Sequence, residues 1–181
     1  MCDIACIDFG LKYLKKSEVE NRRVIEIGSY NVNGSLKPDI IKYLPEKYLG
    51  IDIAPGPNVD EVCDVYDVIK KYGPSSFDVV VSTEMLEHVE FWKVAISNMK
   101  NLTSENGCII LTTRSKGFRL HNYPHDFWRF EVEDMKNIFS DFIIEKIDSD
   151  PCAPGVFIKA TKPENFIEND LSNYEVYRME K

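Results

Sequence analysis

Four acidic residues occur where short apolar runs of the sequence end. Glu26 lies in VIEI, Asp52 in YLGIDI, Asp64 follows the stretch from Val59, and Glu84 follows FDVVV. An acid after the second strand of a nucleotide-binding sheet typically accepts hydrogen bonds from ribose hydroxyls. Several carboxylates in one crevice repel a pyrophosphate and favour a ligand with positive charges. The pattern therefore predicts a site for a cationic nucleoside rather than for an anionic dinucleotide.

Strands and helices must alternate to bring these residues together. Apolar runs predict strands at 24–27, 48–53, 59–65, 77–81, 108–112, 142–147 and 156–160, and helices near 11–16, 35–43, 68–72, 90–102 and 131–139. This alternation predicts a doubly wound α/β sheet, whose ligands bind outside the carboxyl ends of the strands. We expect Trp128 to be largely buried and the acidic tail beyond Lys162 to be loosely held.

The composition is that of one globular domain. A chain of 181 residues predicts a single domain, 1–181, with its core at about 22–162. The net charge of −8 weighs against nucleic-acid binding, and no apolar stretch reaches the length of a membrane span. The five cysteines are scattered without a C-x-x-C pair, and the start MCDIACIDFG is unlike a signal peptide. We therefore expect a cytoplasmic protein without disulfides, and the oligomeric state stays open.

Five stretches in order carry a resemblance to a known family. They are EIGSYNVNGS, YLGIDIAPGPNVD, CDVYDV, FDVVVSTEMLEHV, and GCIILTTR followed by YPHDFWRF, over roughly 23–139. The chain resembles the small, single-domain class I S-adenosylmethionine-dependent methyltransferases. The resemblance implies a Rossmann-like, seven-stranded, mostly parallel sheet with its last strand antiparallel and helices on both faces. It also implies that S-adenosyl-L-methionine donates a methyl group by direct displacement to a small-molecule or sugar-like acceptor.

The resemblance and the strand ends together predict a cofactor site. Glu26 is expected at the methionyl end, Asp52 at the ribose and Asp64 at the adenine. The predicted set is Glu26, Gly28, Ser29, Tyr30, Gly34, Asp52, Ile53, Asp64, Val65, Ser82, Thr83 and Glu84. The first turn departs from the family's commonest E/D-x-G-x-G-x-G, because Tyr30 and Val32 replace two glycines. A nicotinamide-dependent oxidoreductase is the rival, but it needs the glycine-rich turn that this chain lacks.

The stretch HNYPHDFWRF, 121–130, is expected to overhang the crevice where an acceptor enters. His125 is the first candidate for a catalytic base, and Asp126 is its orienter or an alternative base. His88 and His121 are candidate substrate contacts, and Arg129 is a candidate clamp for an acidic substrate group. In the other interpretation, Arg129 only ties this stretch to a carboxylate.

The stretch EMLEH raises the question of a metal. The form Glu-x-x-Glu-His holds magnesium in small-RNA 2′-O-methyltransferases and ubiquinone-pathway O-methyltransferases, together with a later histidine. This resemblance implies a metal-assisted O-methyltransferase with Glu84, Glu87, His88 and His125, or His121, as ligands. Acids at a helix start also complement the helix dipole without any metal, and we expect methyl transfer without one. A methyltransferase-fold binding module that has lost turnover is the third alternative.

Overall fold

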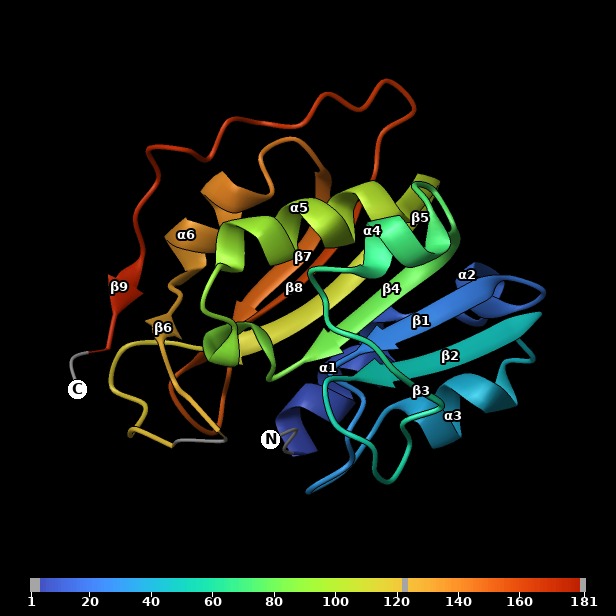
Figure 1. Cartoon of the computed structure of the whole chain (residues 1–181), viewed down its shortest axis with the longest axis horizontal. Coiled ribbons are helices and arrows are strands. Elements are labelled where there is room, and N and C mark those ends of the chain that lie inside the picture. Colours follow the sequence, from blue (N-terminus) through green and yellow to red (C-terminus); the bar gives the residue numbers. More distant parts are fainter. Residues whose placement is uncertain (1–3, 122–123, 180–181) are drawn as a thin grey trace.

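A seven-stranded sheet forms the centre of the structure, a computed structural model that describes residues 4–121 and 124–179 (Figure 1). The sheet order is β3-β2-β1-β4-β5-β8-β7. Its strands are β1 (Arg23–Ile27), β2 (Lys47–Asp52), β3 (Glu61–Val62), β4 (Phe77–Thr83), β5 (Thr103–Arg114), β7 (Ile143–Ser149) and β8 (Gly155–Thr161). The first five pair in parallel, and β8 runs antiparallel to β5 and β7. The predicted sheet, mostly parallel with its last strand antiparallel, is confirmed.

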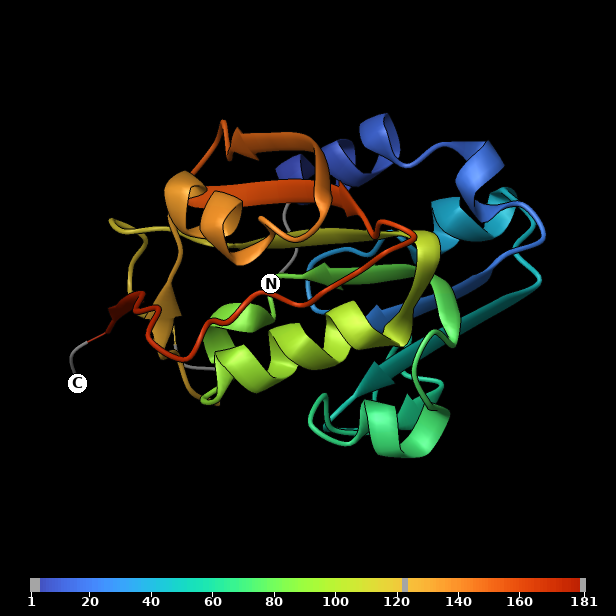
Figure 2. The ribbon, with the colours of Figure 1, turned by 90° about the horizontal axis from the view of Figure 1, so that it is seen from above.

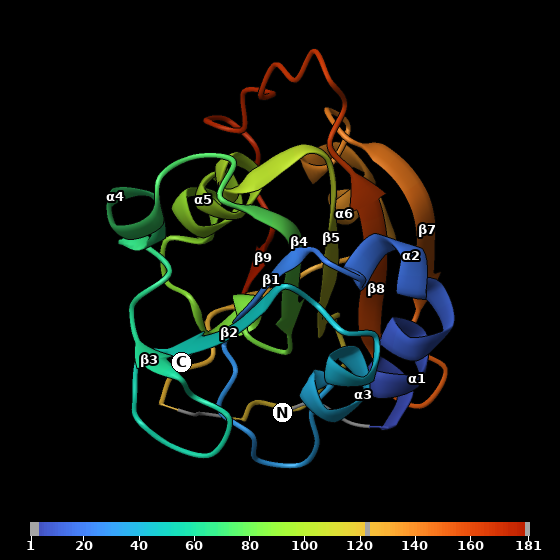
Figure 3. The ribbon, with the colours of Figure 1, turned by 90° about the vertical axis from the view of Figure 1, so that its right-hand side faces the viewer.

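Helices cover both faces of the sheet (Figures 2 and 3). The helices α1 (Ile4–Tyr13), α2 (Lys16–Val19) and α3 (Lys37–Lys42) pack on one face, and α4 (Val68–Tyr72), α5 (Trp92–Leu102) and α6 (Val132–Ile138) pack on the other. The helix predicted near 11–16 is in fact two helices, and it begins earlier. Within the described residues, no helix has both the length and the apolar character needed to cross a bilayer.

The central strands follow directly from their composition. The run FDVVV in β4 is apolar on both faces of a strand, as a strand covered by two helical layers requires. Val79, Val80 and Val81 are accordingly fully buried. Because β4 lies between β1 and β5, its carboxyl end emerges in the middle of the sheet. That end is where a site shared by several strands can form.

The C-terminal segment packs on the molecule, so the prediction of a loosely held tail is wrong. Phe166 and Tyr174 pack against the main core, and Asn169 accepts a hydrogen bond of 2.9 Å from the buried Lys100. The segment ends in β9 (Tyr177–Arg178), which pairs with β6 (Trp128–Arg129) (Figure 1). The average polarity of this segment conceals a few apolar side chains whose burial is favourable.

Trp128, which the sequence predicts to be largely buried, lies at the border of the core and keeps part of its surface exposed. Its indole nitrogen donates a hydrogen bond of 2.9 Å to the carbonyl of Val89, and the guanidinium of Arg178 lies 5.3 Å from the ring centre. The indole N–H thus makes its hydrogen bond at the border of the core, which is common for this side chain.

Candidate active site

A cavity of about 360 Å³ lies at the carboxyl ends of β1, β2 and β4. All the predicted cofactor residues except Ser82 line it: Glu26, Gly28, Ser29, Tyr30, Gly34, Asp52, Ile53, Asp64, Val65, Thr83 and Glu84. Ser82 does not reach the cavity, because it lies one residue inside β4 and is fully covered. The rest of the wall includes Tyr66, Met85, Phe91 and Phe127. The topology thus gathers residues that are up to about a hundred positions apart, from Glu26 to Phe127, into one wall.

The turn after β1 depends on one glycine. Gly28 has a φ of +80°, and a Cβ atom there would lie 2.6 Å from the side chain of Met85. The amides of Gly28 and Ser29 both donate to the carbonyl of Ile51, each at 2.9 Å. A side chain at position 28 would therefore be strained and would clash. Gly28 allows the turn to close although the second and third glycines of the family pattern are missing.

Backbone amides orient two carboxylates of the cavity wall. Asp52 accepts hydrogen bonds from the amide of Tyr30 at 3.1 Å and from the amide of Ala54 at 3.2 Å. Asp64 accepts one from the amide of Tyr66 at 3.0 Å. Each carboxylate oxygen has more than one lone pair, so acceptor capacity remains for a ligand. Both side chains are half-buried, and each can present an oxygen to the cavity.

The charge of the cavity wall is negative. Glu26, Asp52, Asp64, Glu84 and Glu90 line it, and no Lys or Arg is among the lining residues that the structure describes. Phosphate groups would meet the carboxylates of Asp52, Asp64 and Glu90 with no Lys or Arg in the described lining, whereas a cation would be attracted. The cavity therefore suits a positively charged ligand.

Two histidines form part of the wall beyond Glu84. His88 ends the short 3-10 helix η1 (Leu86–His88), and His125 lies on the exposed stretch that faces it. The Nδ1 atom of His88 contacts the carbonyl oxygen of His125 in a short hydrogen bond. Phe127, next in this wall, is held by its amide, which donates to the carbonyl of Glu87 at 2.8 Å. The predicted overhang at 121–130 thus borders the cavity, while positions 122 and 123 of that motif lie outside the described residues.

Asp126 and Arg129 bind each other instead of facing the cavity. The guanidinium donates to both carboxylate oxygens of Asp126, at 2.5 and 2.8 Å, and both side chains are fully buried. Although burial opposes ionisation, Arg129 and the amide of His121 hold the pKa of Asp126 below its usual value. Neither residue lines the cavity. The geometry therefore contradicts Asp126 as a base and Arg129 as a substrate clamp, and it matches the alternative in which Arg129 ties this stretch to a carboxylate.

A second cluster lies behind His88. The Oε1 atom of the fully buried Glu87 is 3.7 Å from Nε2 of His88 and 3.7 Å from Nε2 of His121. Its other oxygen accepts a hydrogen bond of 2.9 Å from Thr113. Burial raises the pKa of Glu87, but His121 and His88 outweigh it and lower the value to about 2. One ligand atom from each of Glu87, His88 and His121 lies within 4.8 Å of the others.

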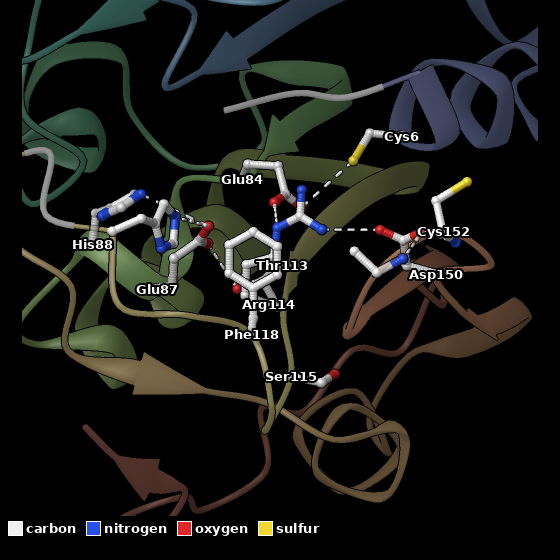
Figure 4. Close-up of polar contacts among 12 residues, drawn as sticks. Cys6, Glu84, Glu87, His88, Thr113, Arg114, Ser115, Phe118, Asp150 and Cys152 are labelled. Atoms are coloured by element: carbon white, nitrogen blue, oxygen red, sulfur yellow. Dashed lines mark hydrogen bonds and ion pairs between the residues drawn. The ribbon is translucent and has the colours of Figure 1, made fainter. Parts of the chain in front are cut away.

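The Glu84 carboxylate belongs to a different set of contacts. Arg114 forms an ion pair with it, and a second pair of 2.9 Å joins Arg114 to the buried Asp150 (Figure 4). The thiol of Cys6 lies 3.5 Å from the other Glu84 oxygen. Glu84 and His125 therefore lie outside the group that the described residues form, whereas Glu87, His88 and the alternative later histidine, His121, lie together. Sequence reasoning missed Arg114, although a charge directly after the apolar run CIILTT was a visible signal.

Comparison with known proteins identifies the class. A family model described as a methyltransferase domain matches residues 5–145. The chain therefore belongs to the methyltransferase-domain family, and the predicted resemblance to class I S-adenosylmethionine-dependent methyltransferases is confirmed. A search of curated protein sequences found no match.

Solved structures share the fold at low sequence identity. One is an S-adenosylmethionine-dependent methyltransferase from Mesorhizobium loti, with a TM-score of 0.62 and 15% identity over 86% of this chain and 98% of that one. A second is the 1,6-didemethyltoxoflavin-N1-methyltransferase of Burkholderia thailandensis with bound 1,6-didemethyltoxoflavin and S-adenosylhomocysteine, at a TM-score of 0.71 and 13% identity over 90% of this chain and 80% of that one. A third is the N-methyltransferase NodS of Bradyrhizobium japonicum WM9, at 0.65 and 14% over 86% and 94%.

Proposed function

We propose that this protein transfers a methyl group from S-adenosylmethionine to a small molecule or sugar-like metabolite. The observation that carries the proposal is the wall of carboxylates without a described Lys or Arg. S-adenosylmethionine has a sulfonium, an ammonium, a ribose diol and an adenine amine, and all of them favour oxygen acceptors. A nicotinamide dinucleotide would have to place its pyrophosphate against the same carboxylates.

Each of three carboxylates binds a different part of the cofactor. Glu26 faces the methionyl ammonium, Asp52 accepts from the ribose diol, and Asp64 lies at the adenine. The reaction is a direct displacement at the sulfonium carbon, so the protein contributes mainly position and the exclusion of water. His125 accepts the proton that the acceptor atom loses, since its imidazole is exposed at the cavity and histidine is the commonest general base.

Ligand binding tests the proposal directly. S-adenosylmethionine and S-adenosylhomocysteine should each raise the melting temperature of the purified protein with increasing concentration, because they bind only the folded state. NAD at the same concentrations should leave it unchanged. A shift with NAD and none with the two adenosyl ligands would refute the assignment.

One observation favours a second candidate, a metal-assisted O-methyltransferase. The carbonyl of His125 can only accept a hydrogen bond, so Nδ1 of His88 carries the proton. Nδ1 of His121 lies 2.9 Å from the Asp126 carboxylate, which favours the same tautomer. Both Nε2 atoms lie 3.7 Å from Oε1 of Glu87, which has no hydrogen-bond partner among the described residues. Ligating histidines typically have this outer partner on the second ring nitrogen, so the donor set suits a divalent cation.

Cobalt titration separates the two candidates. In the second candidate, Co²⁺ should bind the purified protein with a visible absorption band, and Glu87→Gln or His121→Ala should abolish it. His125→Ala is the matched control, since it removes the one histidine outside the cluster. Absence of a band, together with methyl transfer that persists in a chelator, would leave only the metal-free candidate.

A further inference from the structure

A phenol and a carboxyl group from neighbouring strands meet at the methionyl end of the cavity. Tyr48 of β2 donates a short hydrogen bond to Oε2 of Glu26 in β1. The parallel register pairs Val24 with Tyr48 and Glu26 with Gly50, so the two side chains lie on the same face of the sheet. Glu26 is only 2% exposed, yet it lines the cavity. A ligand that enters this end must therefore meet Glu26, whose carboxyl group is held from behind by Tyr48 outside the described lining.

The surroundings of Glu26 contain little positive charge. In the described part of the chain, no Lys or Arg forms an ion pair with it. Lys37, whose charge acts on Glu26 without an ion pair, is bound to Asp60 at 2.8 Å. Burial raises the pKa of Glu26 to about 7, Tyr48 and Lys37 lower it in part, and Asp60 raises it. Without a ligand, the protonated and the ionised forms of the Glu26 carboxyl group are therefore both populated near neutral pH.

We propose that the Tyr48–Glu26 pair is a proton-releasing subsite for the cofactor's methionyl ammonium, with Tyr48 as its positioning residue. When the ammonium arrives, the O–H bond of the Glu26 acid breaks, the proton leaves to solvent, and the carboxylate forms an ion pair with the ammonium. Tyr48 donates to the same oxygen throughout and keeps the carboxylate aimed at the ligand. The inference rests on the proposed function, because it assigns the methionyl end of S-adenosylmethionine to this corner.

Proton release makes affinity depend on pH. Below the pKa of the free group, each lower pH unit weakens binding about tenfold, and above it the affinity levels off. For a group that titrates near pH 7, binding at pH 6 should be roughly tenfold weaker than at pH 8. Tyr48→Phe removes a bond that lowers the pKa of Glu26, so it should move this transition to higher pH.

Isothermal titration with S-adenosylhomocysteine tests the proposal, because this ligand keeps the ammonium but lacks the sulfonium. Titrations at pH 6, 7 and 8, in two buffers with different ionisation enthalpies, should show the affinity change and about half a proton released at pH 7. Glu26→Gln should abolish both, which excludes histidine titration as the source. Tyr43→Phe is the control for Tyr48→Phe, since Tyr43 lies at the end of α3 and outside the cavity lining.

The outcomes are distinguishable. Binding with the same affinity at all three pH values and no dependence of the heat on buffer would overturn the proton-releasing subsite and leave the proposed function standing. A pH dependence that persists in Glu26→Gln would also overturn it. No binding at any pH would instead refute the proposed function itself.

Discussion

The two ends of the cavity are built in different ways. At the cofactor end, Asp52 and Asp64 stand on strand ends, and backbone amides nearby in the sequence orient them. At the acceptor end, buried side chains neutralise each other across long sequence separations, as Arg114 does with Glu84 and Asp150. The first end presents free acceptor capacity to a ligand. At the second end, most charged side chains are paired with one another.

This difference separates binding from stability. A carboxylate held by amides can be removed without leaving a buried charge behind, so its loss should affect ligand affinity mainly. A buried ion pair that loses one partner leaves an uncompensated charge, so its loss should affect the fold. Substitutions at the two ends are therefore expected to have different effects.

The largest expected effect is on catalysis at the acceptor end. His125→Ala should lower turnover by about 10²–10⁴-fold, which is the usual contribution of general base catalysis. The affinity for S-adenosylhomocysteine and the melting temperature should stay nearly unchanged, because the His125 side chain is exposed. The rate is measured with an acceptor found by screening metabolites with labelled methyl donor. Normal turnover in the variant would exclude His125 as the base.

The buried pair should give the next largest effect. Asp126→Ala should reduce the free energy of unfolding by about 3–5 kcal/mol, because Arg129 stays buried without its partner. Arg129→Met alone should also destabilise, but the double variant should recover part of the loss. Denaturant unfolding of the four proteins measures this coupling. Additive losses would mean that the pair does not act as a unit.

At the cofactor end, the buried Glu26 should lower the stability of the folded protein at high pH. Its folded pKa of about 7 lies above the ordinary 4.5, so its stabilising contribution is complete below pH 4.5 and is lost as the pH rises to 7. Glu26→Gln should therefore raise the free energy of unfolding by roughly 3 kcal/mol at pH 8 and leave it unchanged at pH 4. Denaturant titrations at both pH values measure this. An equal change at the two values would contradict the shifted pKa.

Substitution of Asp52 should give the smallest change in free energy of the four, and it should affect ligand binding without affecting stability. Asp52→Ala should weaken affinity for S-adenosylhomocysteine at least tenfold, since charge-assisted hydrogen bonds contribute about 1.5–3 kcal/mol. Its melting temperature without ligand should stay close to that of the parent. Asp67→Ala is a matched control, because Asp67 is exposed and outside the cavity lining. If the two variants had equal affinity for S-adenosylhomocysteine, Asp52 would not be the residue that binds the ribose.

The sequence predicted the two ends unequally well, and the reason is physical. Glu26, Asp52 and Asp64 follow from strand ends, because parallel topology alone brings such positions to one edge. Asp126 and Arg129 were misassigned, because a charge that binds another charge looks the same in a sequence as one that binds a substrate. The packed tail was missed since only a few of its side chains, such as Phe166, supply the contact.

A crystal structure with S-adenosylhomocysteine would show directly which residues hold each part of the cofactor. We expect the ribose hydroxyls within hydrogen-bond distance of the Asp52 carboxylate, the adenine beside Asp64 and Tyr66, and the homocysteine ammonium at Glu26. The sulfur should then point toward His88 and His125. A nucleoside bound on another face of the protein, or bound in this cavity with its ends reversed, would contradict the account.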